Sequence, residues 1–166
     1  LHQWQIAMKP GKPLAYGALR RALPADLDPP ARPATGSTAQ AASVHGALAD
    51  GAGFAAFIGL PGNPVSSFVT FLLLVRPFVL SRQGVGQITP ASYLLRADFD
   101  WLRPDARREF LRARSGADGG VELFANQSSG VLTSAVWGDG LVDNPPQQII
   151  RRGDTVRFLP FSELLG

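Results

Sequence analysis

The sequence predicts an α/β segment of the strand, loop and helix type, followed by a small all-β domain. The first prediction depends on a short run that is apolar on both faces, residues 54–60, followed by a Pro-Gly-Asn-Pro turn and a helical pattern. The second depends on five short strand-like stretches separated by turns in the last part of the chain. Glycine (18 residues) and proline (14) are both abundant, which argues against long unbroken helical bundles. We expect the two domains to span residues 1–86 and 87–166.

The first predicted domain begins with two strands joined by a rigid connection. Residues 4–8 and 14–17 are rich in β-branched, aromatic and small side chains, and the turn sequence Lys-Pro-Gly-Lys-Pro separates them. From about residue 21 to 53 the sequence shifts to Ala, Pro, Gly, Ser, Thr and Asp with almost no apolar period, which predicts a long insertion. We expect residues 54–60 to form a strand buried between helical layers.

A helix is predicted to begin directly after the Pro-Gly-Asn-Pro turn. Asn63 is a favourable N-cap residue and Pro64 a favourable first helical residue. Apolar side chains recur at helical spacing to at least Val75, and Pro77 is expected to kink or restart the helix. The helix has little polar face, so we expect it to be buried on several sides, partly by a second subunit. Its apolar run, 68–75, is shorter than the roughly 20 residues that span a bilayer, so no membrane partner is expected.

The second domain is predicted as a small β-barrel or sandwich built from short strands. These strands are expected at residues 93–96, 109–113, 121–124, 140–142 and 155–159. Their turns are marked by Ala-Asp-Gly-Gly at 117–120 and Arg-Gly-Asp at 152–154.

Composition excludes several classes of site. The chain has no cysteine and 2 histidines, so thiolate chemistry, iron–sulfur clusters and histidine zinc sites are not expected. The absence of cysteine suits a reducing compartment, and we expect a cytoplasmic location. The net charge of +3 comes without a basic run interleaved with aromatic residues, so no nucleic-acid partner is expected. The chain begins with leucine and runs at once into strand-like sequence, which suggests a piece of a longer polypeptide.

Two segments have the chemistry of anion binding. Both lysines of the chain, Lys9 and Lys12, lie within five residues, and a lysine ammonium meets an oxyanion as a point charge. The predicted helix start leaves backbone N–H groups unpaired and carries Ser66 and Ser67 in its first turn. The simpler interpretations are a solvated loop that carries both lysines by chance and a capped helix with nothing bound.

The order of five segments resembles the molybdopterin molybdenumtransferase family, which includes the bacterial MoeA proteins and the E domains of gephyrin-type proteins. These segments are residues 9–13, 61–66 with the later Arg76-Pro77, 107–110, 126–134 and 152–161. The sequence departs from the family pattern at Ala106, where glycine is usual, at Ser128, and in the longer insertion.

The resemblance implies a fold and a reaction. It implies the C-terminal part of a molybdopterin-binding α/β domain, followed by a β-barrel. The implied reaction inserts molybdate into adenylylated molybdopterin and releases AMP, with magnesium (Mg2+) assisting. The magnesium ligands are expected upstream, with no metal ligand in this chain, so we expect little turnover from the chain alone. A cytoplasmic homodimer is also implied.

The resemblance assigns site residues position by position. It implies that Lys9 and Lys12 are catalytic and face the anion. It implies substrate binding by Gly11, Pro13, Pro61, Gly62, Asn63, Pro64, Ser66, Arg107 and Ser129. The simpler interpretation is that most of the arginines near Arg107 lie on a solvated strand face. Ser129 is, on the same interpretation, an ordinary turn residue.

Two other functions stay open at this point. One is a dimerisation or assembly module with a vestigial oxyanion site. The other is a phosphate-binding domain that acts on a different nucleotide-linked substrate, because charge alone does not separate molybdate from phosphate or sulfate.

Overall fold

The computed structural model describes residues 2–5, 7–11, 13–20 and 54–166. These residues form two compact units. Residues 2–4, 15–20 and 54–59 belong to the first unit, and residues 5, 7–11, 13–14 and 60–166 belong to the second. The predicted insertion at about 21–53 lies outside the described residues. The expected division into domains at residues 1–86 and 87–166 stays a prediction.

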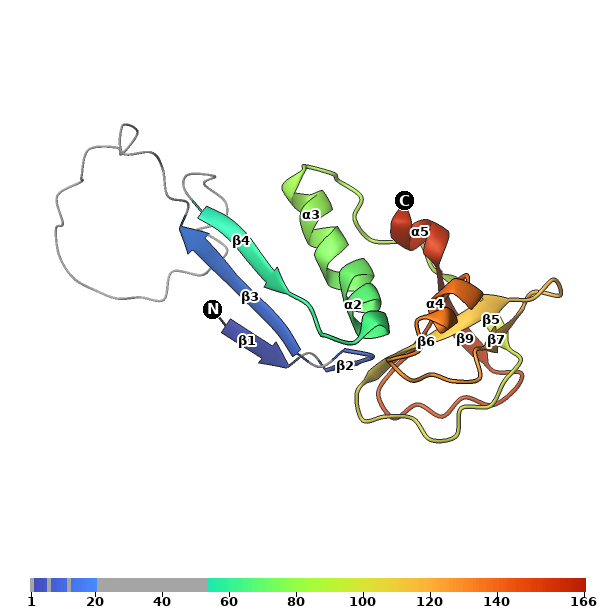
Figure 1. The fold of residues 1–166 in the computed structure, drawn as a ribbon. Coiled ribbons are helices and arrows are strands. Elements are labelled where there is room, and N and C mark those ends of the chain that lie inside the picture. The colour runs from blue at the N-terminus through green and yellow to red at the C-terminus, as the bar shows by residue number, and fades with distance from the viewer. Residues whose placement is uncertain (1, 6, 12, 21–53) are drawn as a thin grey trace, which may run out of the picture. The chain divides into compact units, whose positions relative to one another are not determined.

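The first unit contains a three-stranded sheet (Figure 1). Its strands are β1 (His2–Gln5), β3 (Pro13–Arg20) and β4 (Phe54–Gly59), in the order β1-β3-β4. Strands β3 and β4 are antiparallel, with Ala15 opposite Gly59 and Arg20 opposite Phe54. The prediction of a strand buried on both faces is wrong for this chain, since Phe57 is 39% exposed. An apolar run of this length favours a strand, but it does not specify which layers cover the strand.

The helical part begins where the sequence predicts. Helix α2 (Pro64–Thr70) has Asn63 at its N-cap and proline at its start. It continues through a π-helical turn, η2 (Phe71–Val75), into α3 (Arg76–Arg82). Pro77 lacks an N–H group and its ring crowds the carbonyl four residues earlier, which accounts for the wide turn just before α3.

The helical stretch Pro64–Arg82 is longer than the apolar run that the sequence suggested. By length and composition alone it could cross a membrane, a test that the core helices of soluble proteins also pass. Its residues Val65, Val69 and Leu72 are buried against the β-barrel, whereas α3 has no buried residue and Phe71, Leu74 and Val79 are exposed. The helix is therefore buried along one side, not on several sides as the sequence predicts.

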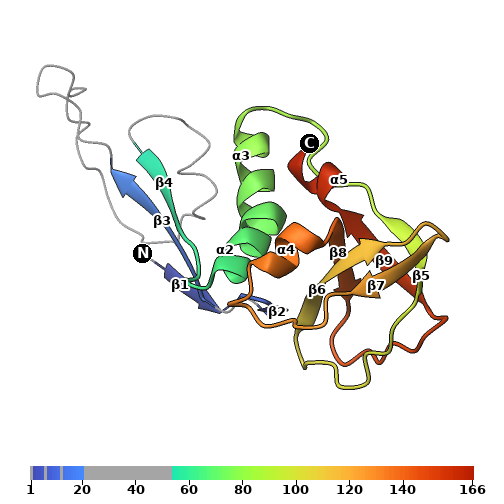
Figure 2. The ribbon, with the colours of Figure 1, turned by 45° about the vertical axis from the view of Figure 1, so that its right-hand side comes forward.

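The barrel prediction is confirmed (Figure 2). Its strands are β5 (Tyr93–Ala97), β6 (Arg108–Ser115), β7 (Gly120–Leu123), β8 (Gly140–Asn144) and β9 (Thr155–Pro160). They follow the order β6-β7-β5-β9-β8, and pairing between β6 and β8 closes the barrel. The short strand β2 (Met8–Lys9) adds to β6 in parallel, with Lys9 opposite Glu109.

Alternate residues of β6 face two different cores. Leu111 and Ala113 face the barrel interior with Val142 and Phe158, whereas Phe110 faces outward to the helix. The outer core contains residues of the helix, the barrel and the final helix α5 (Phe161–Leu165): Met8, Val65, Val69, Leu72, Phe110, Leu141, Leu159, Phe161 and Leu164.

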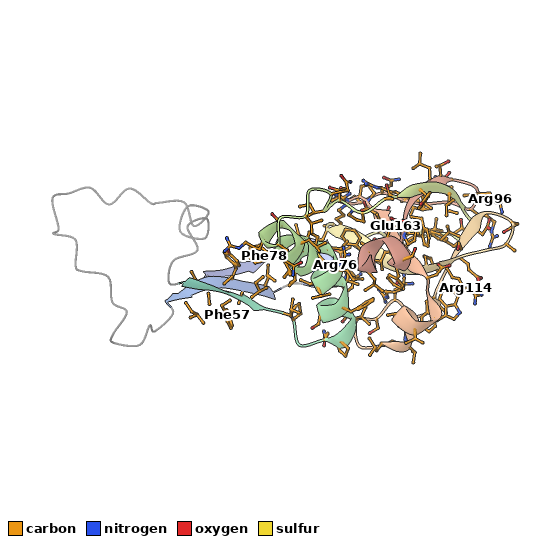
Figure 3. All side chains as sticks on the ribbon, turned by 90° about the horizontal axis from the view of Figure 1, so that it is seen from above. Phe57, Arg76, Phe78, Arg96, Arg114 and Glu163 are labelled. Carbon is orange, nitrogen blue, oxygen red and sulfur yellow. The ribbon has the colours of Figure 1, made fainter. Side chains whose placement is uncertain are left out.

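The last helix is also tied to the helical part by polar and aromatic contacts. The rings of Phe68 and Phe161 meet edge to face at 5.4 Å. The Arg76 guanidinium donates a hydrogen bond of 3.0 Å to the Leu165 carbonyl, and Figure 3 labels Arg76 and Glu163 near this junction. The helix and the barrel therefore share one core in the second unit.

Candidate functional site

A pocket of about 470 Å³ in the second unit brings together four segments that are distant in sequence. Its lining combines prolines and glycines with one lysine, one arginine, two amides and several hydroxyls. The lining residues are Lys9, Pro10, Gly11, Pro61, Gly62, Asn63, Ser66, Arg107, Gln127, Ser128 and Ser129.

Most of the predicted site residues that the structure describes line this pocket. They are Lys9, Gly11, Pro61, Gly62, Asn63, Ser66, Arg107 and Ser129. Pro64 is the exception, because it begins α2 and is not part of the lining. Lys12 and the side chain of Pro13 lie outside the described residues. The roles of all these residues stay predictions.

Gly11 is required by the close approach of its loop to helix α2. Its φ angle is +118°, and a Cβ atom at this position would lie 2.9 Å from Thr70 Oγ1. Residues with a side chain rarely adopt this conformation, so glycine is the favoured residue for both reasons. The loop that carries Lys9 therefore lies directly against helix α2.

Lys9 is compensated by two carboxylates. Its Nζ atom lies 3.5 Å from Asp105 Oδ2 and 3.5 Å from Glu109 Oε1. The Glu109 side chain is fully buried and accepts a hydrogen bond of 2.7 Å from Trp101 Nε1. A buried carboxylate requires such partners, and Glu109 therefore anchors Lys9 at the pocket.

Arg107 is held by the same Asp105. The Nε and Nη2 atoms of Arg107 donate to the two oxygens of Asp105, each at 3.0 Å, and the Arg107 backbone N–H donates to Oδ1 at 3.0 Å. This forked pairing holds the pKa of Asp105 well below its usual range and raises the pKa of Arg107. Both groups are charged at neutral pH, and the orientation of Arg107 is set before any ligand arrives.

The start of α2 differs from the sequence prediction. The sequence suggested unpaired N–H groups at this end, but the Val65 N–H donates to the Ser129 carbonyl at 3.2 Å. The Ser67 N–H makes the ordinary helical bond to the Asn63 carbonyl at 2.9 Å. The Asn63 side chain does not cap the helix and instead donates from Nδ2 to Ser129 Oγ at 3.1 Å. The segment that contains Ser129 is distant in sequence, and it supplies the hydrogen-bond acceptor at the helix start that neighbouring residues do not supply.

Gln127 was missed as an individual site residue, although it lies in a segment that the sequence singled out. Its side-chain amide pairs with the backbone of Arg112 on β6, accepting from the Arg112 N–H at 2.9 Å and donating to the Arg112 carbonyl at 2.9 Å. The Gln127 side chain therefore makes the two backbone hydrogen bonds that a residue of a neighbouring strand would otherwise make. This pairing fixes the segment that presents Ser128 and Ser129 to the pocket.

The described part of the chain has no cluster of side chains that could bind a metal ion. Within residues 2–5, 7–11, 13–20 and 54–166, no three His, Asp or Glu side chains come close enough together to hold a metal ion. The carboxylates beside the pocket are occupied by Lys9 and Arg107.

Comparison with known proteins identifies relatives of both parts of the chain. The family model of the MoeA C-terminal region (domain IV) matches residues 95–161. The chain is 29% identical over 172 residues to the molybdopterin molybdenumtransferase of Haemophilus influenzae, covering 98% of this chain and 34% of that protein. It is 39% identical over 97 residues to the molybdenum cofactor synthesis protein cinnamon of Drosophila melanogaster, covering 54% of this chain and 16% of that protein.

Solved structures show the same fold. The crystal structure of a molybdopterin biosynthesis moeA protein from Pyrococcus horikoshii superposes with a TM-score of 0.63 at 16% identity, covering 96% of this chain and 33% of that chain. A molybdenum cofactor biosynthesis protein from Pyrococcus furiosus superposes with a TM-score of 0.61 at 17% identity, covering 95% of this chain and 44% of that chain.

The chain thus spans about a third or less of the length of the curated relatives that it matches. The matched barrel domain, the relative that aligns along nearly the whole chain and the shared fold agree with one another. Residues 95–161 match the C-terminal domain of the MoeA proteins, and the chain as a whole is similar to the C-terminal part of a molybdopterin molybdenumtransferase.

Proposed function

We propose that this chain takes part in molybdenum cofactor biosynthesis. Its pocket would supply the oxyanion-binding part of a site that inserts molybdate into adenylylated molybdopterin and releases AMP. The names of the two curated relatives support the pathway, and the pocket supports the kind of ligand.

The observation that carries the proposal is the convergence of Lys9, Arg107, Asn63 and Ser129 on one pocket. Molybdate and phosphate are tetrahedral dianions with oxygen atoms on all sides. An ammonium, a guanidinium, an amide and a hydroxyl can donate to several of those oxygens at once. Because Asp105 and Glu109 already hold the two cations in place, little reorganisation accompanies anion binding.

In this proposal the chain acts through position and charge. Lys9 and Arg107 orient the anion and stabilise negative charge that develops as it is transferred, and Lys12 joins them as the resemblance implies. Magnesium, a homodimeric assembly and a cytoplasmic location belong to the proposal through the resemblance. The chain alone is expected to bind its anion without appreciable turnover.

One observation favours the alternative of an assembly module with a vestigial site. The two cations that line the pocket face two carboxylates, those of Asp105 and Glu109, so these four side chains carry no net charge. A pocket of this kind attracts a dianion less strongly than two unpaired cations would.

Calorimetric titration of the chain with molybdate at low ionic strength tests the proposal. We expect saturable binding that weakens by about tenfold in Lys9→Met, the loss typical of one charge-assisted contact. Arg157→Met is the matched control, because it removes the same charge from a side chain outside the pocket. Absence of binding by the folded wild-type chain would favour the assembly module. Equal or tighter binding of phosphate or sulfate would favour a different nucleotide-linked substrate.

A further inference from the structure

Arg112 is a buried cation beside the pocket that does not belong to its lining. It lies on the outer face of β6 and is 1% exposed, the largest fully buried side chain of the described residues. From the sequence, most of the arginines near Arg107 were expected on a solvated strand face. Arg103, Arg108 and Arg114 are indeed exposed, and Arg112 is the one that is buried. The segment from Gln127 to Ser134, which includes the start of helix α4 (Thr133–Trp137), supplies the hydrogen-bond partners of its guanidinium.

The contacts of this guanidinium all reach that one segment. Its Nε atom donates to Ser134 Oγ at 3.1 Å and its Nη2 atom donates to the Ser128 carbonyl at 3.2 Å. Ser134 Oγ in turn donates to the Val131 carbonyl at 2.6 Å. Together with the Gln127 amide on the same backbone, these bonds fix the segment at both of its ends.

Arg112 also lacks a compensating charge among the described residues. No Asp or Glu of that part of the chain forms an ion pair with it, and its partners are a hydroxyl and a carbonyl. Burial lowers the pKa of the guanidinium to about 10, so it remains charged at neutral pH. A buried cation without a carboxylate is costly, and a structure that retains one gains something other than stability from it.

The charges at the pocket suggest what that gain is. Lys9 and Arg107 are each matched by a carboxylate, whereas Arg112 is matched by none. Its guanidinium binds the carbonyl of Ser128, a residue that lines the pocket, so its positive potential reaches the pocket through protein rather than through water.

We propose that Arg112 is a positioning residue of the anion pocket: it holds Ser128 and Ser129 in place and supplies the uncompensated positive charge that makes the pocket attractive to an oxyanion. This inference rests on the proposed function, because it concerns the same pocket and the same class of ligand.

Three variants of the whole chain separate charge from shape, with molybdate as the probe in calorimetric titration at low ionic strength. Arg112→Met keeps much of the side-chain volume and removes the charge. Arg112→Lys keeps the charge but cannot reach both Ser128 and Ser134 with a planar fork. Arg114→Met is the matched control. Arg114, labelled in Figure 3, lies two residues along the same strand, is 47% exposed and pairs with Glu122.

We expect Arg112→Met to weaken molybdate binding by about tenfold or more, Arg112→Lys to recover part of the loss, and Arg114→Met to bind as the wild type does. Wild-type affinity in a folded Arg112→Met variant would overturn the inference, as would an equal loss in the methionine and lysine variants. If Arg112→Met does not fold, Arg112→Lys decides, because wild-type affinity in that variant contradicts the positioning role. A wild-type chain that binds no molybdate would instead count against the proposed function itself.

Discussion

Replacement of Asp105 by asparagine should increase the affinity of the pocket for an oxyanion. Asp105 pairs with Arg107 through two hydrogen bonds of 3.0 Å and lies 3.5 Å from the Lys9 ammonium. Its charge therefore opposes both pocket cations. Asp105→Asn keeps the shape and one acceptor oxygen but removes that charge.

The size of the effect follows from the geometry. An anion on the open side of Arg107 is separated from the Asp105 carboxylate by the guanidinium, a distance of roughly 8 Å between the two charges. At an effective dielectric constant of about 20, two unit like charges at this distance repel by about 2 kcal/mol, so a dianion is repelled by about 4 kcal/mol. Water at the open pocket screens this repulsion to about 1–2 kcal/mol, and its removal should tighten binding by about 5- to 30-fold.

The assay is calorimetric titration with molybdate at low ionic strength, repeated at high ionic strength, where screening should reduce the gain. Asp118→Asn is the control: it makes the same change in net charge at an exposed carboxylate that pairs with Arg96, outside the pocket. Unchanged or weaker binding by a folded Asp105→Asn variant would refute this electrostatic description and indicate that the orientation of Arg107 matters more than the net charge.

Three further predictions concern stability. Leu72→Ala should lower the free energy of unfolding by about 2–5 kcal/mol in urea, with helix and barrel signals lost together; separate transitions would contradict the shared core. Gly140→Ala should lower the thermal midpoint, because its Cβ atom would lie 2.4 Å from the Phe158 ring; an unchanged midpoint would show that this ring moves freely. Because its pKa is depressed in the folded state, Asp105 should stabilise the fold above about pH 4 and lose that contribution as the pH falls further, so acid unfolding of Asp105→Asn should show a shallower pH dependence than that of the wild type.

Local chemistry was enough to predict the first helix and the five barrel strands of the second unit. The helix start at Asn63 and Pro64 and the five barrel strands depend on capping, proline geometry and alternation of apolar residues, which act over a few neighbouring residues. The order of motifs was also enough to indicate the family, since motif order is a property of the chain itself.

The partners of the site residues could not be predicted in the same way. The Asn63 side chain binds Ser129, which is 66 residues away, and Lys9 meets Glu109 because β2 adds to β6 in parallel. Neither contact leaves a local signal in the sequence. The sequence around a charged residue does not show whether an opposite charge lies near it in the folded chain.

Arg112 shows the limit most clearly. By sequence it is one of several arginines on a strand, and the exposed Arg114 lies two residues further along the same strand. The closure of the barrel and the packing of the segment from Gln127 to Ser134 bury the first and leave the second in solvent. The sequence by itself determined which residues of this chain carry charge and where helices and strands begin. The tertiary structure alone decided which of those charges are buried, paired or left uncompensated, because burial and pairing are set by segments that meet only when the chain is folded.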